Sequence, residues 1–149
     1  MIGLYFAYGS NMKSERLRAR VPSARARGIA RLEGRRLLVR KRGADGSAKA
    51  NLVPAREGAV WGVLYELALG DFARLDRHER GYARIRVRVR TPGGADHEAT
   101  TYVSNRTFDG VPFDWYLALL VEGAREHGLP EDYVARLEAL PRRPDRRDR

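Results

Sequence analysis

The chain has 149 residues, of which 43% are hydrophobic, so it is long enough to form one domain around one core. The absence of cysteine excludes disulfides, thiolate nucleophiles, cysteine-ligated zinc sites and iron–sulfur clusters, and it fits a reducing, cytoplasmic environment. The formal net charge is +10, but lysine occurs only at positions 13, 41 and 49 and the arginines are dispersed, which favours a solvated basic surface over a nucleic-acid-binding face.

The N-terminal segment predicts a buried strand at Ile2–Ala7, because it is short, apolar and aromatic and a glycine follows it. It has neither the basic leader nor the long apolar stretch of a signal peptide. No apolar run along the chain approaches the roughly 20 residues that cross a bilayer, so we expect no membrane partner. A short helix is expected within residues 10–21.

The middle of the chain predicts a series of short strands. Residues 28–32 and 35–40 form two of them, separated by Glu33 and Gly34, and a flexible loop follows at residues 42–48. Residues 51–54 favour a brief strand and residues 59–67 a central one. Asp71 is a plausible N-cap for a short helix that Gly81 would end.

Residues 82–90 give the clearest strand, because apolar and charged residues alternate strictly along it. Its inward residues are Ile85, Val87 and Val89, and its outward residues are Arg84, Arg86, Arg88 and Arg90. After a turn, residues 97–103 return as the partner strand. Residues 112–127 predict a helix, and residues 129–132 begin a last one.

The strands outnumber the helices and lack βαβ crossovers, so the fold class is α+β with a mostly antiparallel sheet or small barrel. We assign the domain to residues 1–140. Residues 141–149 contain no apolar side chain except proline, which predicts a disordered basic tail.

The segment Tyr8-Gly9-Ser10-Asn11 directly follows the first strand. Gly9 permits a positive φ and a close backbone approach, successive N–H groups in such a turn can hold an anion, and Ser10 and Asn11 add side-chain donors. Glycine, serine and asparagine are also ordinary turn residues, so a plain β-turn is the alternative.

Glu79 lies at the predicted end of a helix, where the helix dipole disfavours a carboxylate and raises its pKa, as suits a general base. The alternative is an exposed glutamate beside Arg77 and Arg80. Three tyrosines distant in sequence converge on one pocket or else pack in the core; they are Tyr82, Tyr102 and Tyr116. The histidines lack a metal-ligand pattern, and no nucleotide loop or Gly-x-Ser-x-Gly motif is present, so no metal and no cofactor are expected.

Taken in order, these segments resemble the γ-glutamylcyclotransferase family, also described as avirulence-induced-gene-like. The family has a strand followed by Tyr-Gly-Ser-Asn, here Tyr8 to Asn11. It has a Trp-Gly-Val strand, here from Trp61, and a Leu-Asp pair before its catalytic glutamate, here Leu75-Asp76 before Glu79. The stretch from Gly123 to Pro130 is similar to the C-terminal helices of the animal enzymes. The chain departs from the pattern at Arg80, which separates Glu79 from Gly81.

The resemblance implies a small mixed, mostly antiparallel β-barrel with flanking helices. It implies an enzyme in which the α-amine of a γ-glutamyl substrate attacks its own γ-carbonyl and releases 5-oxoproline and an amino acid or amine. Glu79 would be the general acid and base. The substrate would be bound by Tyr8, Gly9, Ser10, Asn11, Tyr82, Tyr102 and Tyr116.

The resemblance leaves several points open. The enzyme's partner would be a small γ-glutamyl compound, and a homodimer stays open. A γ-glutamylamine cyclotransferase and a biosynthetic enzyme that removes a γ-glutamyl group share the chemistry and differ in the leaving amine. A non-catalytic module that binds a small molecule or nucleic acid is the alternative of a different class.

Overall fold

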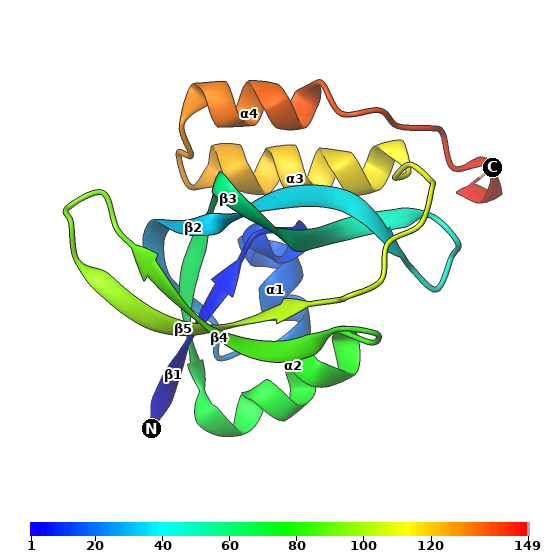
Figure 1. Cartoon of the computed structure of the whole chain (residues 1–149). Helices are drawn as coiled ribbons and strands as arrows, with labels where there is room; N and C mark the ends of the chain where they lie inside the picture. The colour runs from blue at the N-terminus through cyan, green and yellow to red at the C-terminus, as the bar shows by residue number, and fades with distance from the viewer. Residues whose placement is uncertain (149) are drawn as a thin grey trace.

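Five strands close into a barrel in the computed structural model, which describes residues 1–148 (Figure 1). Around the barrel the strands follow the order β1-β3-β2-β4-β5, and only β1 and β5 run parallel. The strands are β1 (Ile2–Ala7), β2 (Arg25–Arg42), β3 (Ala48–Ala68), β4 (Ala83–Arg90) and β5 (Asp96–Val103). The α+β class and the mixed, mostly antiparallel barrel are thereby confirmed.

Helices flank the barrel on two sides. Helices α3 (Asp114–Glu126) and α4 (Glu131–Glu138) lie together on one side in Figure 1, and α2 (Phe72–His78) lies on the opposite side. A 3₁₀ turn (Ser10–Met12) and helix α1 (Ser14–Arg20) follow β1 directly, and short 3₁₀ turns also occur at Leu69–Asp71 and Arg146–Asp148. Within residues 1–148, no helix has the length and apolar character needed to cross a membrane.

The hairpin of β2 and β3 is longer and more continuous than the sequence predicted. The break expected at Glu33 and Gly34 is a register shift between Glu33 and Arg35, and Pro54 lies opposite Arg35. Glu33 pairs with Ala59 and Arg35 pairs with Pro54, so Gly34 alone lies opposite residues 55–58 of β3. The extra residues of β3 bulge out without ending the ladder, so glycine and proline interrupt the pattern but not the strand. The two predicted pairs of strands are therefore one hairpin, closed by the loop at residues 43–47.

Strand β4 has the expected alternation. Val89 is fully buried, whereas the four arginines are exposed. Three of these arginines pair with nearby acids: Arg84 with Asp76, Arg86 with Glu98 and Arg90 with Asp96. Since these carboxylates already face the guanidinium groups, the row has less charge to offer a phosphate backbone than its sequence indicates.

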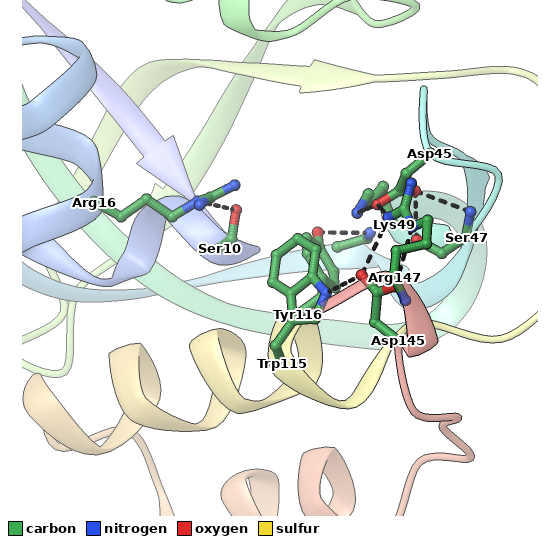
Figure 2. A network of polar contacts seen from close by, with 10 residues as sticks. Ser10, Arg16, Asp45, Ser47, Lys49, Trp115, Tyr116, Asp145 and Arg147 are labelled. Carbon is green, nitrogen blue, oxygen red and sulfur yellow. Dashed lines mark hydrogen bonds and ion pairs between the residues drawn. The ribbon is translucent and has the colours of Figure 1, made fainter. Parts of the chain in front are cut away.

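The C-terminal segment differs from the disordered tail expected over residues 141–149. Arg143 forms a bridge with Phe113, in which its N–H donates to the Pro112 carbonyl (3.0 Å) and its carbonyl accepts from the Asp114 N–H (2.8 Å). The Trp115 Nε1–H donates to Asp145 (3.0 Å), as Figure 2 shows. The expectation considered only apolar burial, whereas polar and backbone contacts hold this segment. Arg149 lies outside the described residues.

The same segment reaches the hairpin loop. Arg147 pairs with Asp145 (3.0 Å) and lies 3.6 Å from Asp45 at the β2–β3 turn (Figure 2). Asp45 also accepts hydrogen bonds from the backbone and side chain of Ser47 and from Lys49. These bonds outweigh the effect of burial and lower the pKa of Asp45 to about 2. The chain end thus contacts the loop through an ionised carboxylate.

Ending the chain after Leu140 should destabilise the protein. The hydrogen bonds that are lost contribute roughly 1 kcal/mol each to stability. We therefore expect the free energy of unfolding to fall by about 2 kcal/mol and Tm to fall by about 4–8 °C. Asp145→Asn, which keeps the side-chain shape but weakens the contacts with Trp115 and Arg147, should give a smaller fall in the same direction. Thermal unfolding followed by circular dichroism measures both. An unchanged Tm in the truncated chain would indicate that residues 141–149 are disordered after all.

Candidate active site

A cavity of about 400 Å³ opens where the loop after β1, the end of α2 and the β2–β3 hairpin meet. Every residue that the sequence singled out for a site lines this one cavity. They are Tyr8, Gly9, Ser10, Asn11, Glu79, Tyr82, Tyr102 and Tyr116. Six chain segments contribute to its wall, so the site exists only in the closed barrel.

Glu79 follows the last residue of α2, and its N–H donates to the carbonyls of Leu75 and Asp76. Its Oε1 accepts a hydrogen bond from Asn11 Nδ2 (3.0 Å). Burial raises the pKa of this carboxyl to about 7, against the opposing effects of Arg20, Lys41, Arg16 and the Asn11 hydrogen bond. The raised pKa expected from the sequence is present, but its main cause is burial and not the helix end.

The Tyr8–Asn11 segment leads into a buried 3₁₀ turn, in which the Met12 N–H donates to the Gly9 carbonyl (3.0 Å). Gly9 has φ −116°, so the positive φ that the sequence allowed is not used. The glycine is instead favoured by close packing, because a Cβ there would lie 3.1 Å from the Cβ of Ala50, a tight contact, and 3.5 Å from the Tyr116 hydroxyl. The turn is thus pressed between the hairpin and helix α3.

Helix α3 supports the turn from behind at Gly123. A Cβ at this position would lie 2.7 Å from the Lys13 backbone nitrogen and 2.8 Å from the Met12 carbonyl carbon. Only a residue without a side chain permits this approach. The glycine of the Gly123–Pro130 stretch therefore sets how closely the helix holds the loop that borders the cavity.

The tyrosine hydroxyls fall into two groups according to where their protons point. Tyr8 donates to the Tyr102 carbonyl, Tyr82 donates to the Ala50 carbonyl (2.5 Å) and Tyr102 donates to Asp76 (2.6 Å). Their single protons are therefore used within the protein. The Tyr116 hydroxyl instead accepts from the Ala50 N–H (3.0 Å), which leaves its proton available to a ligand.

Tyr5 belongs to the second group, although the sequence analysis did not select it. It lies in β1, lines the cavity and is buried. Its hydroxyl accepts from Asn11 Nδ2 (3.1 Å), and burial raises its pKa well above the usual value, so it remains a neutral donor. The sequence did not distinguish Tyr5 from its neighbours, because β1 reads as a short apolar and aromatic strand.

Several basic side chains at the cavity were also missed. Arg16 and Arg20 lie four apart on α1, a spacing that places them on one helix face and would have identified them. Arg16 Nε donates to the Ser10 hydroxyl (3.1 Å), and Lys41 donates to the Arg80 carbonyl (2.9 Å). Both partners are uncharged, so two positive charges are directed at the cavity without a protein counter-ion in these contacts.

Lys49 has a different setting at the hairpin end of the cavity. It pairs with Asp45 (3.1 Å) and lies 4.5 Å from the Tyr116 ring centre (Figure 2). Burial lowers its pKa even though Asp45 favours the charged form. No group of three or more histidine and acidic side chains in residues 1–148 is arranged to hold a metal ion.

Comparisons with known proteins agree with this architecture. Residues 59–137 match the model of the AIG2-like family. The chain is 32% identical to mouse γ-glutamylcyclotransferase over 148 residues, covering 92% of this chain and 78% of the relative, and 31% identical to the human enzyme over 146 residues with the same coverage. A solved structure of a γ-glutamyl cyclotransferase superposes with a TM-score of 0.91 at 28% identity, covering 98% of this chain and 90% of that chain.

More distant structures share the fold alone. A Bacillus subtilis protein, YkqA, superposes with a TM-score of 0.78 at 20% identity, covering 95% of this chain and 56% of that chain. The family match spans more than half of this chain and includes Glu79, Tyr82, Tyr102 and Tyr116. From the barrel, the converging site residues and these similarities, we conclude that the chain belongs to the AIG2-like family and groups with its γ-glutamylcyclotransferases.

Proposed function

We propose that the protein cyclises γ-glutamyl compounds, releasing 5-oxoproline and an amino acid, with Glu79 as the general acid and base. One observation carries the proposal: a buried carboxyl with a pKa of about 7 lines a cavity that is rich in basic side chains. A carboxyl that titrates near the working pH is suited both to accept and to return a proton. The similarity to the mouse and human enzymes supports the same reaction class.

In the proposed reaction, the substrate's α-amine attacks its γ-carbonyl carbon, so a ring C–N bond forms and the amide C–N bond breaks. Glu79 accepts a proton from the attacking nitrogen and then donates it to the leaving nitrogen. The carboxylate is thereby regenerated, and no oxidant or cofactor takes part in the balance. Because both reacting groups belong to one molecule, holding them in orientation supplies much of the rate.

Tyr5 and Tyr116 suit the negative charge that develops on the γ-carbonyl oxygen or rests on a substrate carboxylate. Both hydroxyls accept a bond from the protein and keep a proton for a ligand. Tyr5 shares Asn11 with Glu79, so we assign it to the developing oxyanion. Tyr116 lies beside Lys49, which suits a carboxylate of the substrate.

The charge of the cavity favours a leaving group that carries a carboxylate. A γ-glutamyl amino acid has two carboxylates, and Arg16 and Lys41, which line the cavity, donate to the uncharged Ser10 hydroxyl and Arg80 carbonyl. A γ-glutamylamine would leave one of these cations without a counter-ion. This argument favours γ-glutamyl amino acids over the γ-glutamylamine alternative.

Glu79→Gln should reduce 5-oxoproline release by about 10²- to 10⁴-fold, because the amide keeps the shape of the side chain but cannot exchange the proton. Glu98→Gln is a matched control, since the same change falls on an exposed residue of β5 that pairs with Arg86. The control should retain parental turnover. Chromatographic detection of 5-oxoproline measures both variants, and near-parental turnover by Glu79→Gln would remove Glu79 from the chemistry.

The same substitution should stabilise the protein above pH 7. The folded-state pKa of Glu79 is raised from 4.5 to about 7, so the folded protein holds a proton that the unfolded chain has released between these values. Parental stability therefore falls as pH rises through this window, by up to about 3 kcal/mol from this group. Denaturant unfolding should show equal stabilities below about pH 4.5 and a more stable variant at pH 8. A parental protein as stable as the variant at pH 8 would contradict the burial of this charge.

A matched pair of substrates tests the leaving group. γ-Glutamylalanine and γ-glutamylethylamide differ by one carboxylate, so the first should give a kcat/KM at least about tenfold higher, as expected for one charge-assisted hydrogen bond. Arg16→Gln should reduce this preference by raising KM for γ-glutamylalanine. Equal turnover of the two compounds would favour the γ-glutamylamine alternative, and release of 5-oxoproline from neither would favour a binding module.

A further inference from the structure

Asn11 connects a buried chain of polar groups at the base of the cavity. Its Oδ1 accepts from Arg20 Nη1 (3.2 Å), while its Nδ2 donates to Glu79 Oε1 (3.0 Å) and to the Tyr5 hydroxyl (3.1 Å). Asn11 is 3% exposed, so water has little access to its amide. The amide therefore makes three hydrogen bonds, one through its oxygen and two through its nitrogen, with residues of three different chain segments.

The chemistry of the groups fixes the direction of these bonds. A guanidinium only donates, so the amide oxygen of Asn11 must face Arg20 and the amide nitrogen must face Glu79 and Tyr5. With Arg20 removed, the amide can turn over, and its oxygen can then accept from a protonated Glu79 or from Tyr5. Arg20 therefore selects the orientation in which Asn11 donates to an ionised carboxylate.

We propose that Arg20 is a positioning residue that acts through Asn11: it orients the amide so that Glu79 is held as a carboxylate and the Tyr5 hydroxyl proton stays directed at the substrate. The proposal rests on the proposed function for its kinetic consequence, but not for its effect on Glu79. Asn11, which the sequence assigned to substrate binding, then supports the base instead.

Arg16 provides the internal comparison. It lies one turn before Arg20 on the same helix and lines the same cavity, and its charge also lowers the pKa of Glu79. Its hydrogen bond goes to Ser10, however, and not to Asn11. A change at Arg16 therefore removes a similar charge while leaving the orientation of the amide intact.

The other groups around Glu79 do not compete for this role. The cations that face it are Arg16 and Arg20 from α1 and Lys41 from β2. Arg77, His78 and Arg80 adjoin Glu79 in sequence and line the same cavity. Five phenols also interact with Glu79, and they come from β1 and its exit, the residue before β4, β5 and α3: Tyr5, Tyr8, Tyr82, Tyr102 and Tyr116. Burial raises the pKa of each phenol, so all five are neutral where Glu79 titrates.

The test measures Glu79 directly and catalysis separately. In protein carrying ¹³C-labelled glutamate, Arg20→Gln should move the Glu79 carboxyl titration to higher pH by about one unit, and Arg20→Lys should largely restore it, because it returns a charged donor. With γ-glutamylalanine, Arg20→Gln should lower kcat about tenfold with KM changed less than about twofold. Arg16→Gln should instead raise KM.

Dependence on Asn11 separates positioning from a direct charge effect. In an Asn11→Ala background, Arg20→Gln should cause little further loss of kcat; a full tenfold loss there, or a rise in KM as the main effect, would overturn the proposal. Should Arg20→Gln fail to fold, Asn11→Asp is the second variant, because it keeps the side-chain shape and replaces the donor with an acceptor. It should move the Glu79 carboxyl titration to higher pH than in the parental protein. If Glu79 titrates in Asn11→Asp at the parental pH, the proposal is equally overturned.

A parental protein that releases no 5-oxoproline would instead refute the proposed function. The carboxyl titrations would still test the role of Arg20 in that case.

Discussion

The withdrawal of the Glu79 carboxyl from water is the constraint on which the site depends. Burial raises the pKa of this carboxyl, three nearby cations and the Asn11 hydrogen bond lower it, and the balance gives a pKa of about 7. The balance requires that the basic side chains lie close to Glu79 without forming a direct ion pair with its carboxylate. Asn11 meets this requirement, because it connects Arg20 to the carboxylate through a neutral amide.

The barrel supplies the rigid frame that this balance needs. At the hairpin end, β1 no longer covers β3, so the backbone groups of Ala50 face the cavity side. The Tyr82 hydroxyl donates to the Ala50 carbonyl, and the Tyr116 hydroxyl accepts from the Ala50 N–H. These bonds join the residue before β4 and helix α3 to one residue of the hairpin. Gly9 and Gly123 allow the loop to be pressed between these same elements. The walls of the cavity therefore hold one another in place.

Four basic residues of the cavity divide into three settings. Arg20 is bound to Asn11, Lys49 is paired with Asp45, and Arg16 and Lys41 meet only neutral partners in the contacts described above. This division explains how a strongly positive cavity can both hold an ionised glutamate and attract an anionic substrate. It also gives the arginine-rich composition a local use that its dispersion along the sequence concealed. The cytoplasmic location and the homodimer remain predictions.

The sequence by itself predicted where most of the barrel strands and helices lie, and it identified eight of the residues that line the cavity. Alternation along β4, the short apolar β1 and the ordered motifs depend on local spacing, which the sequence displays directly. All eight expected residues line one cavity, although only the closed barrel brings their segments together.

Tertiary structure decided the contacts and the surroundings of each of these residues. The continuity of the β2–β3 hairpin, the contacts of the C-terminal segment and the orientation of each tyrosine hydroxyl depend on partners distant along the chain. The position of Arg20 against Asn11, nine residues apart across a turn and a helix, is likewise set by packing. Hydrogen-bond direction and desolvation are properties of three-dimensional surroundings, so the pattern of residues named the members of the site but could not assign their protons.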